Sequence, residues 1–179
     1  VGSRAQSGCA LWWKGEERHG PRNLAARLNH RMQHLTIGAR YDLGGGLEGT
    51  FNDASFSISA GATFDEDLRL ATTEATTACR LVYRNASDQA VCQVDVATAY
   101  AVSAGALQYD NAGTLTATGV NKFVKNWVYK TNDPDYPIYV LVGQAEFPTV
   151  ALARASAQIV PPNIATREWV LLYSVIYKN

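Results

Sequence analysis

The chain has 179 residues with 16 basic and 16 acidic side chains, and a formal charge of zero argues against nucleic acid as its partner. With 47% hydrophobic and 18% charged residues, it can bury the core of one ordinary domain. Its longest apolar run, Trp169 to Ile176, has the length of a strand and is too short for a membrane helix, which argues against membrane insertion.

The first predicted element is a helix from Pro21 to Leu35. Proline suits the first position of a helix, and an apolar stripe recurs every three or four residues. The stripe consists of Leu24, Leu28, Met32 and Leu35. The opposite face is polar, so a helix of this length is marginal in water unless its stripe packs on a partner. The partner is either the body of the same domain or the same helix from neighbouring chains, and periodicity does not decide between them.

A change of composition after this helix predicts the domain boundary. Residues 38–55 are rich in Gly, Ser, Asn and Asp and include the run Gly44–Gly46, which is typical of a flexible link or a tight turn. From Phe56 onward, apolar and small polar residues alternate as in short strands. We therefore predict an N-terminal segment containing the helix at 1–37, a glycine-rich link at 38–55 and a β-sandwich domain at 56–179.

The clearest predicted hairpin joins Cys79–Arg84 to Val91–Val96 across a polar turn. Its predicted facing pairs are Arg84–Val91, Tyr83–Cys92, Leu81–Val94 and Cys79–Val96. This register places Arg80 opposite Asp95 on the solvent-exposed face. It also separates Cys79 from Cys92, so no disulfide between them is expected. The three cysteines, an odd number at unrelated spacings, are expected to be reduced, partly buried thiols.

Three more elements complete the prediction. A second hairpin joins 123–130 to 138–143 across a loop rich in Asp and Pro, and a short helix is expected at 149–159 between prolines. The last strand, 169–177, is apolar on both faces, with Trp169 and Leu171 on one of them, so the core and another sheet or subunit should cover it. The prediction is a mainly β fold, an antiparallel β-sandwich with a short N-terminal helix and one short helix near the C-terminus.

Sequence motifs for metal binding or catalysis are absent. His30 and His34 lie four residues apart on the predicted helix, but no third ligand is evident. Residues 65–67 are three consecutive acids, which indicate a solvated turn because alternation along an extended chain separates them. We therefore predict no catalytic residue, no metal and no cofactor.

Aromatic side chains near loops are the best candidates for ligand contact. Tyr136 lies between Asp133 and Asp135 in the loop of the second hairpin. An aromatic ring can stack on a sugar while neighbouring carboxylates accept hydrogen bonds from its hydroxyls, so we predict these three residues as ligand-binding. The alternative is that such rings lie in the core or at a subunit interface.

The chain resembles bacteriophage tail-fibre and virion appendage proteins in the order of its segments. The resemblance rests on three features. The first is the predicted helix Asn23-Leu24-Ala25-Ala26-Arg27-Leu28-Asn29-His30-Arg31-Met32, and the second is the glycine-rich link that follows it. The third is a series of segments typical of β-strands, such as Phe56-Ser57-Ile58-Ser59-Ala60 and Ile138-Tyr139-Val140-Leu141-Val142. In such proteins a short helix often assembles three chains ahead of a β-rich head.

The resemblance implies a structural protein of the virion with no enzymatic activity. It implies a homotrimer with Leu24, Leu28, Met32, Leu35, Trp169 and Leu171 at the oligomer interface. Other virion proteins and a host cell-surface glycan are the further expected partners, with host attachment as the expected role. A capsid decoration or fibre-anchoring protein is the alternative, and it would bury residues 1–36 against another protein. A glycan-cleaving enzyme is a third class, which would require two carboxylates across a cleft.

Overall fold

The computed structural model of this chain describes residues 6–7, 39–65, 68–72, 74–133, 135–159 and 169–179. The predicted helix at 21–35 and its stripe of Leu24, Leu28, Met32 and Leu35 lie outside these ranges, as do His30, His34, Glu66 and Asp67. The described part is mainly β, with several antiparallel sheets and one short helix, as the coarse prediction of fold class stated. In the described ranges no helix has the length and apolar character that crossing a bilayer requires.

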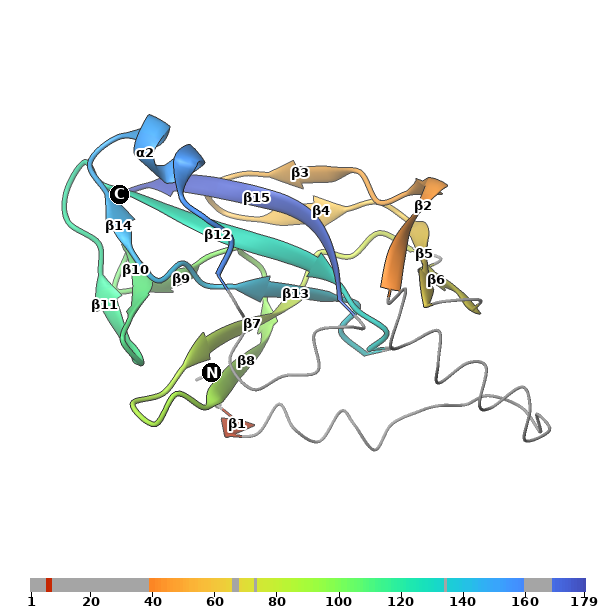
Figure 1. The fold of residues 1–179 in the computed structure, drawn as a ribbon, viewed down its shortest axis with the longest axis horizontal. Coiled ribbons are helices and arrows are strands. Elements are labelled where there is room, and N and C mark those ends of the chain that lie inside the picture. Colours follow the sequence, from red (N-terminus) through yellow and green to blue (C-terminus); the bar gives the residue numbers. More distant parts are fainter. Residues whose placement is uncertain (1–5, 8–38, 66–67, 73, 134, 160–168) are drawn as a thin grey trace.

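A central sheet of seven strands runs along the molecule (Figure 1). Its order is β1 (Gln6–Ser7), β8 (Ala90–Val96), β7 (Cys79–Arg84), β13 (Ile138–Leu141), β12 (Phe123–Lys130) and β14 (Glu146–Phe147), with β15 (Val170–Lys178) along the other side of β12. All pairs are antiparallel except β13 and β7, which run parallel. The strand β12 is therefore central, and seven of its eight residues are buried.

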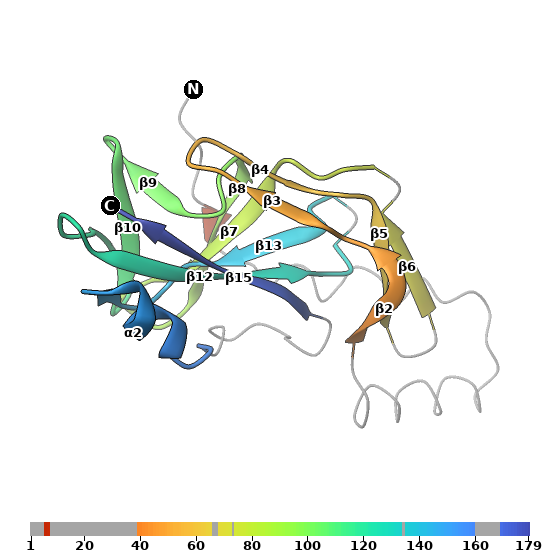
Figure 2. The ribbon, with the colours of Figure 1, turned by 90° about the horizontal axis from the view of Figure 1, so that it is seen from above.

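Three smaller sheets and one helix surround the central sheet. The sheets comprise β9 (Ala101–Ser103), β10 (Ala106–Asn111) and β11 (Thr114–Ala117); β2 (Ala39–Gly46), β5 (Gly61–Asp65) and β6 (Leu68–Thr72); and β3 (Gly49–Phe51) with β4 (Phe56–Ile58). The helix is α2 (Val150–Ala155), which Thr149 caps by accepting a hydrogen bond from the backbone N–H of Leu152. Seen from above, β3 and β4 lie on one side of the central sheet and α2 lies on the other (Figure 2).

Each face of the central sheet has its own hydrophobic cluster. On the side of β3, β4 and β9, Phe56 and Ile58 pack with alternate residues of β7, β12 and β13, such as Val140. On the side of α2, the cluster consists of Val82, Cys92, Trp127, Tyr129, Tyr139 and Leu141. Because successive residues of a strand point to opposite faces, a strand buried on both sides is mostly apolar, as β13 is. The central strand β12 also buries Lys125, Asn126 and Lys130, and each of these side chains donates a hydrogen bond to a backbone carbonyl.

A buried hydrogen-bond network joins the central sheet to the β9–β11 sheet. Asn126 of β12, which is fully buried, donates from Nδ2 to Ala99 O at 3.0 Å and accepts at Oδ1 from the backbone N–H of Gly143 at 2.8 Å. The carbonyl of Gly143 accepts from the backbone N–H of Asp110 at 2.8 Å. The Asp110 carboxylate, 1% exposed, accepts from the backbone N–H and Nε of Arg84, at 3.1 and 2.9 Å.

The same network clamps two hairpin turns together. Asp110 Oδ1 also accepts from the backbone N–H of Gly113 at 2.8 Å, in the turn between β10 and β11. Gly113 has φ +92°, and a Cβ there would lie 2.2 Å from the carbonyl oxygen of Asn85 in the β7–β8 turn. Only glycine allows this close approach and this backbone conformation.

The β7–β8 hairpin is confirmed, but its predicted register is only partly correct. Near its base, Cys79 faces Val96 as predicted, whereas toward the turn the pairs shift by one, so that Arg84 faces Ala90. The turn is the reason: Asn85 Oδ1 accepts from the backbone N–H groups of Ser87 and Gln89, which shortens the loop to five residues. A bulge between Cys79 and Leu81 absorbs the difference.

The second hairpin, the short helix and the last strand form, whereas the segment 38–55 and the cysteines differ from the prediction. The hairpin of β12 and β13 is confirmed, with Trp127 facing Leu141, and the short helix appears as α2. The last strand forms as β15. The segment 38–55, predicted as a link, contains β2 and β3 from residue 39 onward. Cys79 is a free buried thiol as expected, whereas Cys92 is disulfide-bonded, so the expectation of three reduced thiols was wrong.

Candidate functional site

The loop between β12 and β13, residues 131–137, contains the three predicted ligand-binding residues. Asp133 is buried, at 2% exposure, and its carboxylate is used within the protein. Oδ1 accepts from the backbone N–H of Asp135 at 2.9 Å and of Tyr136 at 2.8 Å, and Oδ2 accepts from the hydroxyl of Tyr139 at 2.8 Å. Asp133 therefore shapes the loop, and Asp135 is the exposed carboxylate on it.

Burial dominates the electrostatics of Asp133. It raises the pKa of this carboxyl above its ordinary value because the charged form loses water. Hydrogen bonds from Tyr136 and Tyr139 and the charge of Arg80 oppose the shift, since each of them favours the carboxylate. The same environment raises the pKa of Tyr139, whose phenol is desolvated and lies beside the carboxylate.

Thr131 makes three hydrogen bonds to other residues of this loop, and we call a loop that is held internally in this way braced. The backbone N–H of Thr131 donates to Pro137 O at 2.9 Å, closing the base of the loop. The Thr131 hydroxyl donates to Tyr136 O at 3.3 Å and accepts from the backbone N–H of Asp133 at 3.2 Å. A loop held by this many internal bonds loses little conformational entropy when it binds a partner.

Arg80 of β7 lies between two tyrosine rings beside the loop. Its guanidinium carbon is 4.7 Å from the ring centroid of Tyr136 and 5.3 Å from that of Tyr139, which are cation–π distances. Its Nη1 donates to the Tyr139 hydroxyl at 3.0 Å and lies 3.6 Å from Asp133 Oδ2. The Tyr136 hydroxyl donates to Asp95 Oδ1 at 2.9 Å. We call Arg80, Asp95, Asp133, Tyr136 and Tyr139 the Arg80 cluster.

The Arg80 cluster differs from the cross-strand pair that the sequence predicted. Arg80 was expected to face Asp95 across the hairpin, but the guanidinium contacts Asp133 and the two tyrosines. Asp95 has φ +58°, and it meets the cluster through the hydroxyl of Tyr136. The predicted ligand-binding set did not include Arg80 and Tyr139, because these residues face each other on β7 and β13 and reach the loop only in the folded sheet.

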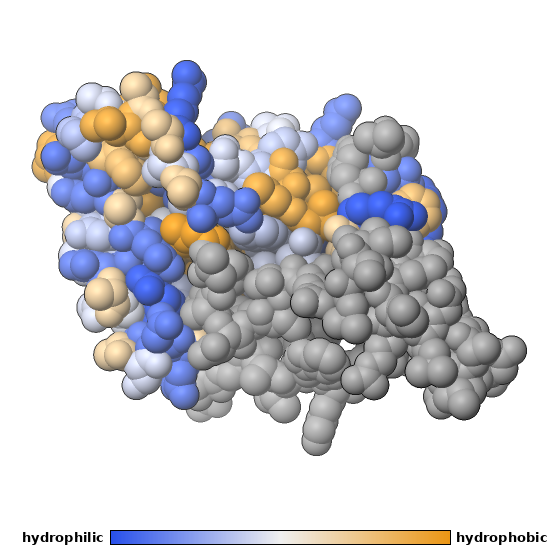
Figure 3. All heavy atoms as spheres, viewed as in Figure 1, coloured by the Kyte–Doolittle hydropathy of each residue, from blue (hydrophilic) through white to orange (hydrophobic). Residues whose placement is uncertain are grey.

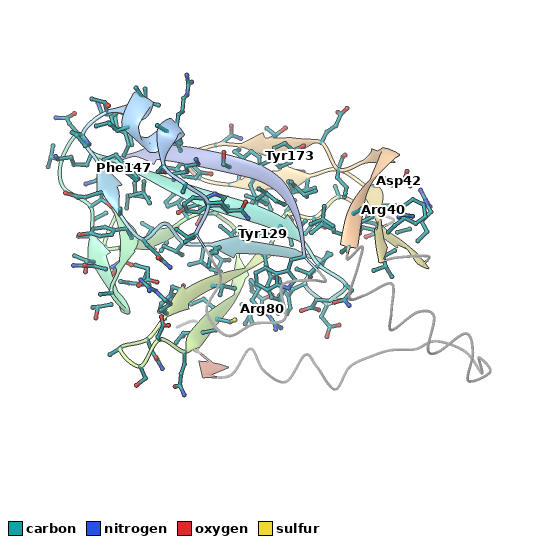
Figure 4. The ribbon with its side chains drawn as sticks, viewed as in Figure 1. Arg40, Asp42, Arg80, Tyr129, Phe147 and Tyr173 are labelled. Carbon is teal, nitrogen blue, oxygen red and sulfur yellow. The ribbon has the colours of Figure 1, made fainter. Side chains whose placement is uncertain are left out.

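The Arg80 cluster adjoins further aromatic side chains, because the ring of Trp169 contacts both Tyr139 on β13 and Tyr129 on β12. Trp169 lies 5.0 Å from the ring of Tyr139 and 5.3 Å from the ring of Tyr129, measured between centroids. Figure 4 labels Tyr129 and Arg80, which come from strands on opposite sides of β13. The Tyr129 hydroxyl accepts from Gln158 Nε2 at 2.8 Å. Trp169, predicted at an oligomer interface, is half-buried here by its own chain, while Leu171 is 40% exposed.

Lys130 is the second buried charge beside the loop. It is 4% exposed, and its ammonium donates to Thr131 O at 2.5 Å. Burial lowers its pKa from 10.5 to about 8, and the negative charge of Asp133 opposes the shift.

We expect Lys130 to make stability depend on pH in alkaline solution. Between pH 8 and 10.5 the folded protein has lost a proton that the unfolded chain still binds, so stability rises with pH, by about 1 kcal/mol per pH unit. Urea unfolding at pH 7, 8, 9 and 10 should show this slope as a difference between wild type and Lys130→Met. Val120→Met, at a position that is 81% exposed and carries no titratable group, is the control and should follow wild type. Identical pH profiles for wild type and Lys130→Met would contradict the prediction.

The arrangement suits binding better than proton transfer. Each titratable side chain of the Arg80 cluster is a hydrogen-bond or ion-pair partner of another member. In the part of the chain that the structure describes, no three His, Cys, Asp or Glu side chains are grouped as metal ligands. The loop presents outward the side chains of Asn132 and Asp135 and the half-buried ring of Tyr136.

Comparison of the chain with family models, with curated proteins and with solved structures gave no match.

Proposed function

We propose that this chain is a structural module of a phage virion, a tail-fibre or appendage protein that attaches to the host surface. In this proposal the helix at 21–35 joins three copies, with Leu24, Leu28, Met32 and Leu35 on the three-fold axis. The central sheet and the layer of β3, β4, β9 and β10 act as the two sheets of a sandwich. The mainly β architecture and the resemblance to fibre proteins support the proposal.

The observation that carries the attachment role is the braced loop 131–137. Asp133 and Thr131 hold the loop from inside, through hydrogen bonds to the backbone of Asp135 and Tyr136. Arg80 packs beneath the ring of Tyr136, and the hydroxyl of that ring is tied to Asp95. A fixed aromatic edge next to carboxylate acceptors is suited to a hydroxyl-rich glycan.

The test is binding of the folded chain to bacterial cells and to their purified surface polysaccharides. We expect Tyr136→Ala to weaken binding about 2- to 10-fold, since one aromatic contact contributes about 0.5–1.5 kcal/mol. Tyr136→Phe is the matched control, because it keeps the ring and removes only the hydrogen bond to Asp95. It should bind within about twofold of wild type.

Two outcomes would contradict the proposal in different ways. Equal binding by wild type and Tyr136→Ala would show that the loop 131–137 is not the region that contacts the glycan. A folded trimer that binds none of the cells or polysaccharides would favour a decoration or fibre-anchoring protein, whose partner is another virion subunit.

A further inference from the structure

The strand β15 forms an open edge of the central sheet. It pairs along one side with β12, and no strand of the described ranges pairs with its other side. In Figure 2, β15 runs along β12, and no described strand lies along its other side. An open edge presents unpaired N–H and C=O groups, which are a template for another strand.

The register identifies the backbone groups that point outward. Just beyond β15, the backbone N–H of Asn179 donates to Lys122 O at 3.0 Å, and Asn179 O accepts from the backbone N–H of Asn121 at 3.1 Å, so both backbone groups of Asn179 point toward the side of β12. Hydrogen-bonded and non-hydrogen-bonded pairs alternate in an antiparallel ladder. In the regular part of the ladder, from Tyr173 to Lys178, the residues whose N–H and C=O point away from β12 are therefore Ser174, Ile176 and Lys178.

This edge lacks most of the features by which proteins prevent edge-to-edge pairing. Its regular part begins at Tyr173, beyond a bulge at Leu172, and contains neither proline nor glycine. Its single charged residue is Lys178, at the very end of the strand. Ser174 is exposed and Ile176 is half-buried. Such an edge is expected to be covered by another strand.

Apolar residues flank the same end of the edge. The helix α2 contacts β15, and it lies beside the C-terminal end of this strand in Figures 1 and 2. It exposes Val150 and Leu152, by 39% and 52%, and Figure 3 shows apolar residues on α2 and along β15 on one face of the molecule. A partner that pairs with β15 would also cover part of this surface.

We propose that β15 pairs antiparallel with β15 of a second copy, about a two-fold axis at Ile176. In this register Ile176 faces its own symmetry mate and Ser174 faces Lys178, so all three outward residues are paired. No two like charges face each other, and the same patch serves both copies, as an isologous contact requires. The β15 edge of a second, identical chain therefore fits this edge.

This inference goes beyond the proposed function because the two contacts differ in symmetry. A helix on a three-fold axis joins copies in threes, whereas β15 joins them in pairs. Sedimentation equilibrium of the full chain therefore distinguishes them. An even-numbered assembly, either a dimer or a hexamer, supports the β15 contact, and a monomer or an isolated trimer overturns it.

Opposite charges at one position provide a matched pair of variants. Ser174→Lys places like charges opposite Lys178 twice per contact, and we expect the dissociation constant to rise about tenfold. Ser174→Glu places a carboxylate opposite Lys178, and the dissociation constant should fall. Equal dissociation constants for the two variants would overturn the register.

A second variant tests the edge itself. Ile176→Pro removes an outward N–H that β12 does not use, so the strand can remain in the sheet as an edge strand. We expect it to halve the mass of the assembly while circular dichroism stays like wild type. Val102→Lys, at an exposed apolar position on β9, is the control and should leave the mass unchanged. An unchanged mass for a folded Ile176→Pro variant would overturn the inference.

The helix contact is tested separately with Leu28→Glu. If this variant converts a hexamer to a dimer, both contacts operate. If wild type is a dimer that Leu28→Glu leaves intact but Ile176→Pro dissociates, the β15 contact holds and the proposed trimer fails.

Discussion

Asp110→Asn is expected to lower the free energy of unfolding by about 3–5 kcal/mol, because it breaks a buried ion pair from one side. The Asp110 carboxylate accepts three hydrogen bonds, two from Arg84 and one from the backbone N–H of Gly113. An amide group in its place presents an N–H₂ to donors and leaves the guanidinium of Arg84 without its buried counter-ion. Urea unfolding followed by tryptophan fluorescence measures the change.

Asp88→Asn is the matched control on the same guanidinium. Asp88 Oδ1 lies 3.3 Å from Arg84 Nη1, but its side chain is 73% exposed. Exposed ion pairs contribute about 0–1 kcal/mol, and asparagine tolerates the positive φ at this position. We expect a change below about 1 kcal/mol. Equal decreases in the free energy of unfolding for the two variants would contradict the conclusion that the buried carboxylate of Asp110 connects the two hairpins.

Asn126→Ala is expected to cost about 3–5 kcal/mol, through unpaired backbone groups and a cavity. The variant leaves the carbonyl of Ala99 and the N–H of Gly143 buried without their partner, at about 1–3 kcal/mol each. Asn111→Ala, on the exposed end of β10, should change stability by less than about 0.5 kcal/mol. Thermal and urea unfolding of both variants give the comparison, and a loss below about 1 kcal/mol for Asn126→Ala would refute the role of the amide.

The two sites are also expected to be coupled. Gly143 connects them, since its N–H binds Asn126 and its C=O accepts from the backbone of Asp110. Residues of one hydrogen-bond network usually show non-additive effects of about 0.5–3 kcal/mol. A double variant should therefore lose less than the sum of the two single variants.

The local elements of the fold could be predicted from the sequence. The apolar segments 123–130 and 138–143 and the turn residues at 132–137 between them predict a hairpin, and Pro148 and Thr149 precede the helix α2. These signals are reliable because side-chain period and turn chemistry depend on neighbouring residues. The β7–β8 register failed at the turn, where one side chain, Asn85, decides the length of the loop.

The candidate site could be predicted only in part. Tyr136 and its acidic neighbours are recognisable in the sequence, but the two aspartates have different environments. Asp133 is buried and bonded to the loop, whereas Asp135 is exposed. The difference arises from Arg80 and Tyr139, which belong to other strands and reach Asp133 only in the folded sheet.

By itself, the sequence determined that this protein is mainly β, and it located the hairpin of β7 and β8, the hairpin of β12 and β13, and the last strand, β15. The tertiary structure alone decided that β13 runs parallel to β7, that Asn126 and Asp110 are buried and hydrogen-bonded to other strands, and that β15 is an edge strand among the described residues. The physical reason is the range of the interactions. Alternation and turn propensity act between neighbours, whereas strand order and the pairing of buried polar groups depend on contacts between residues far apart in the chain.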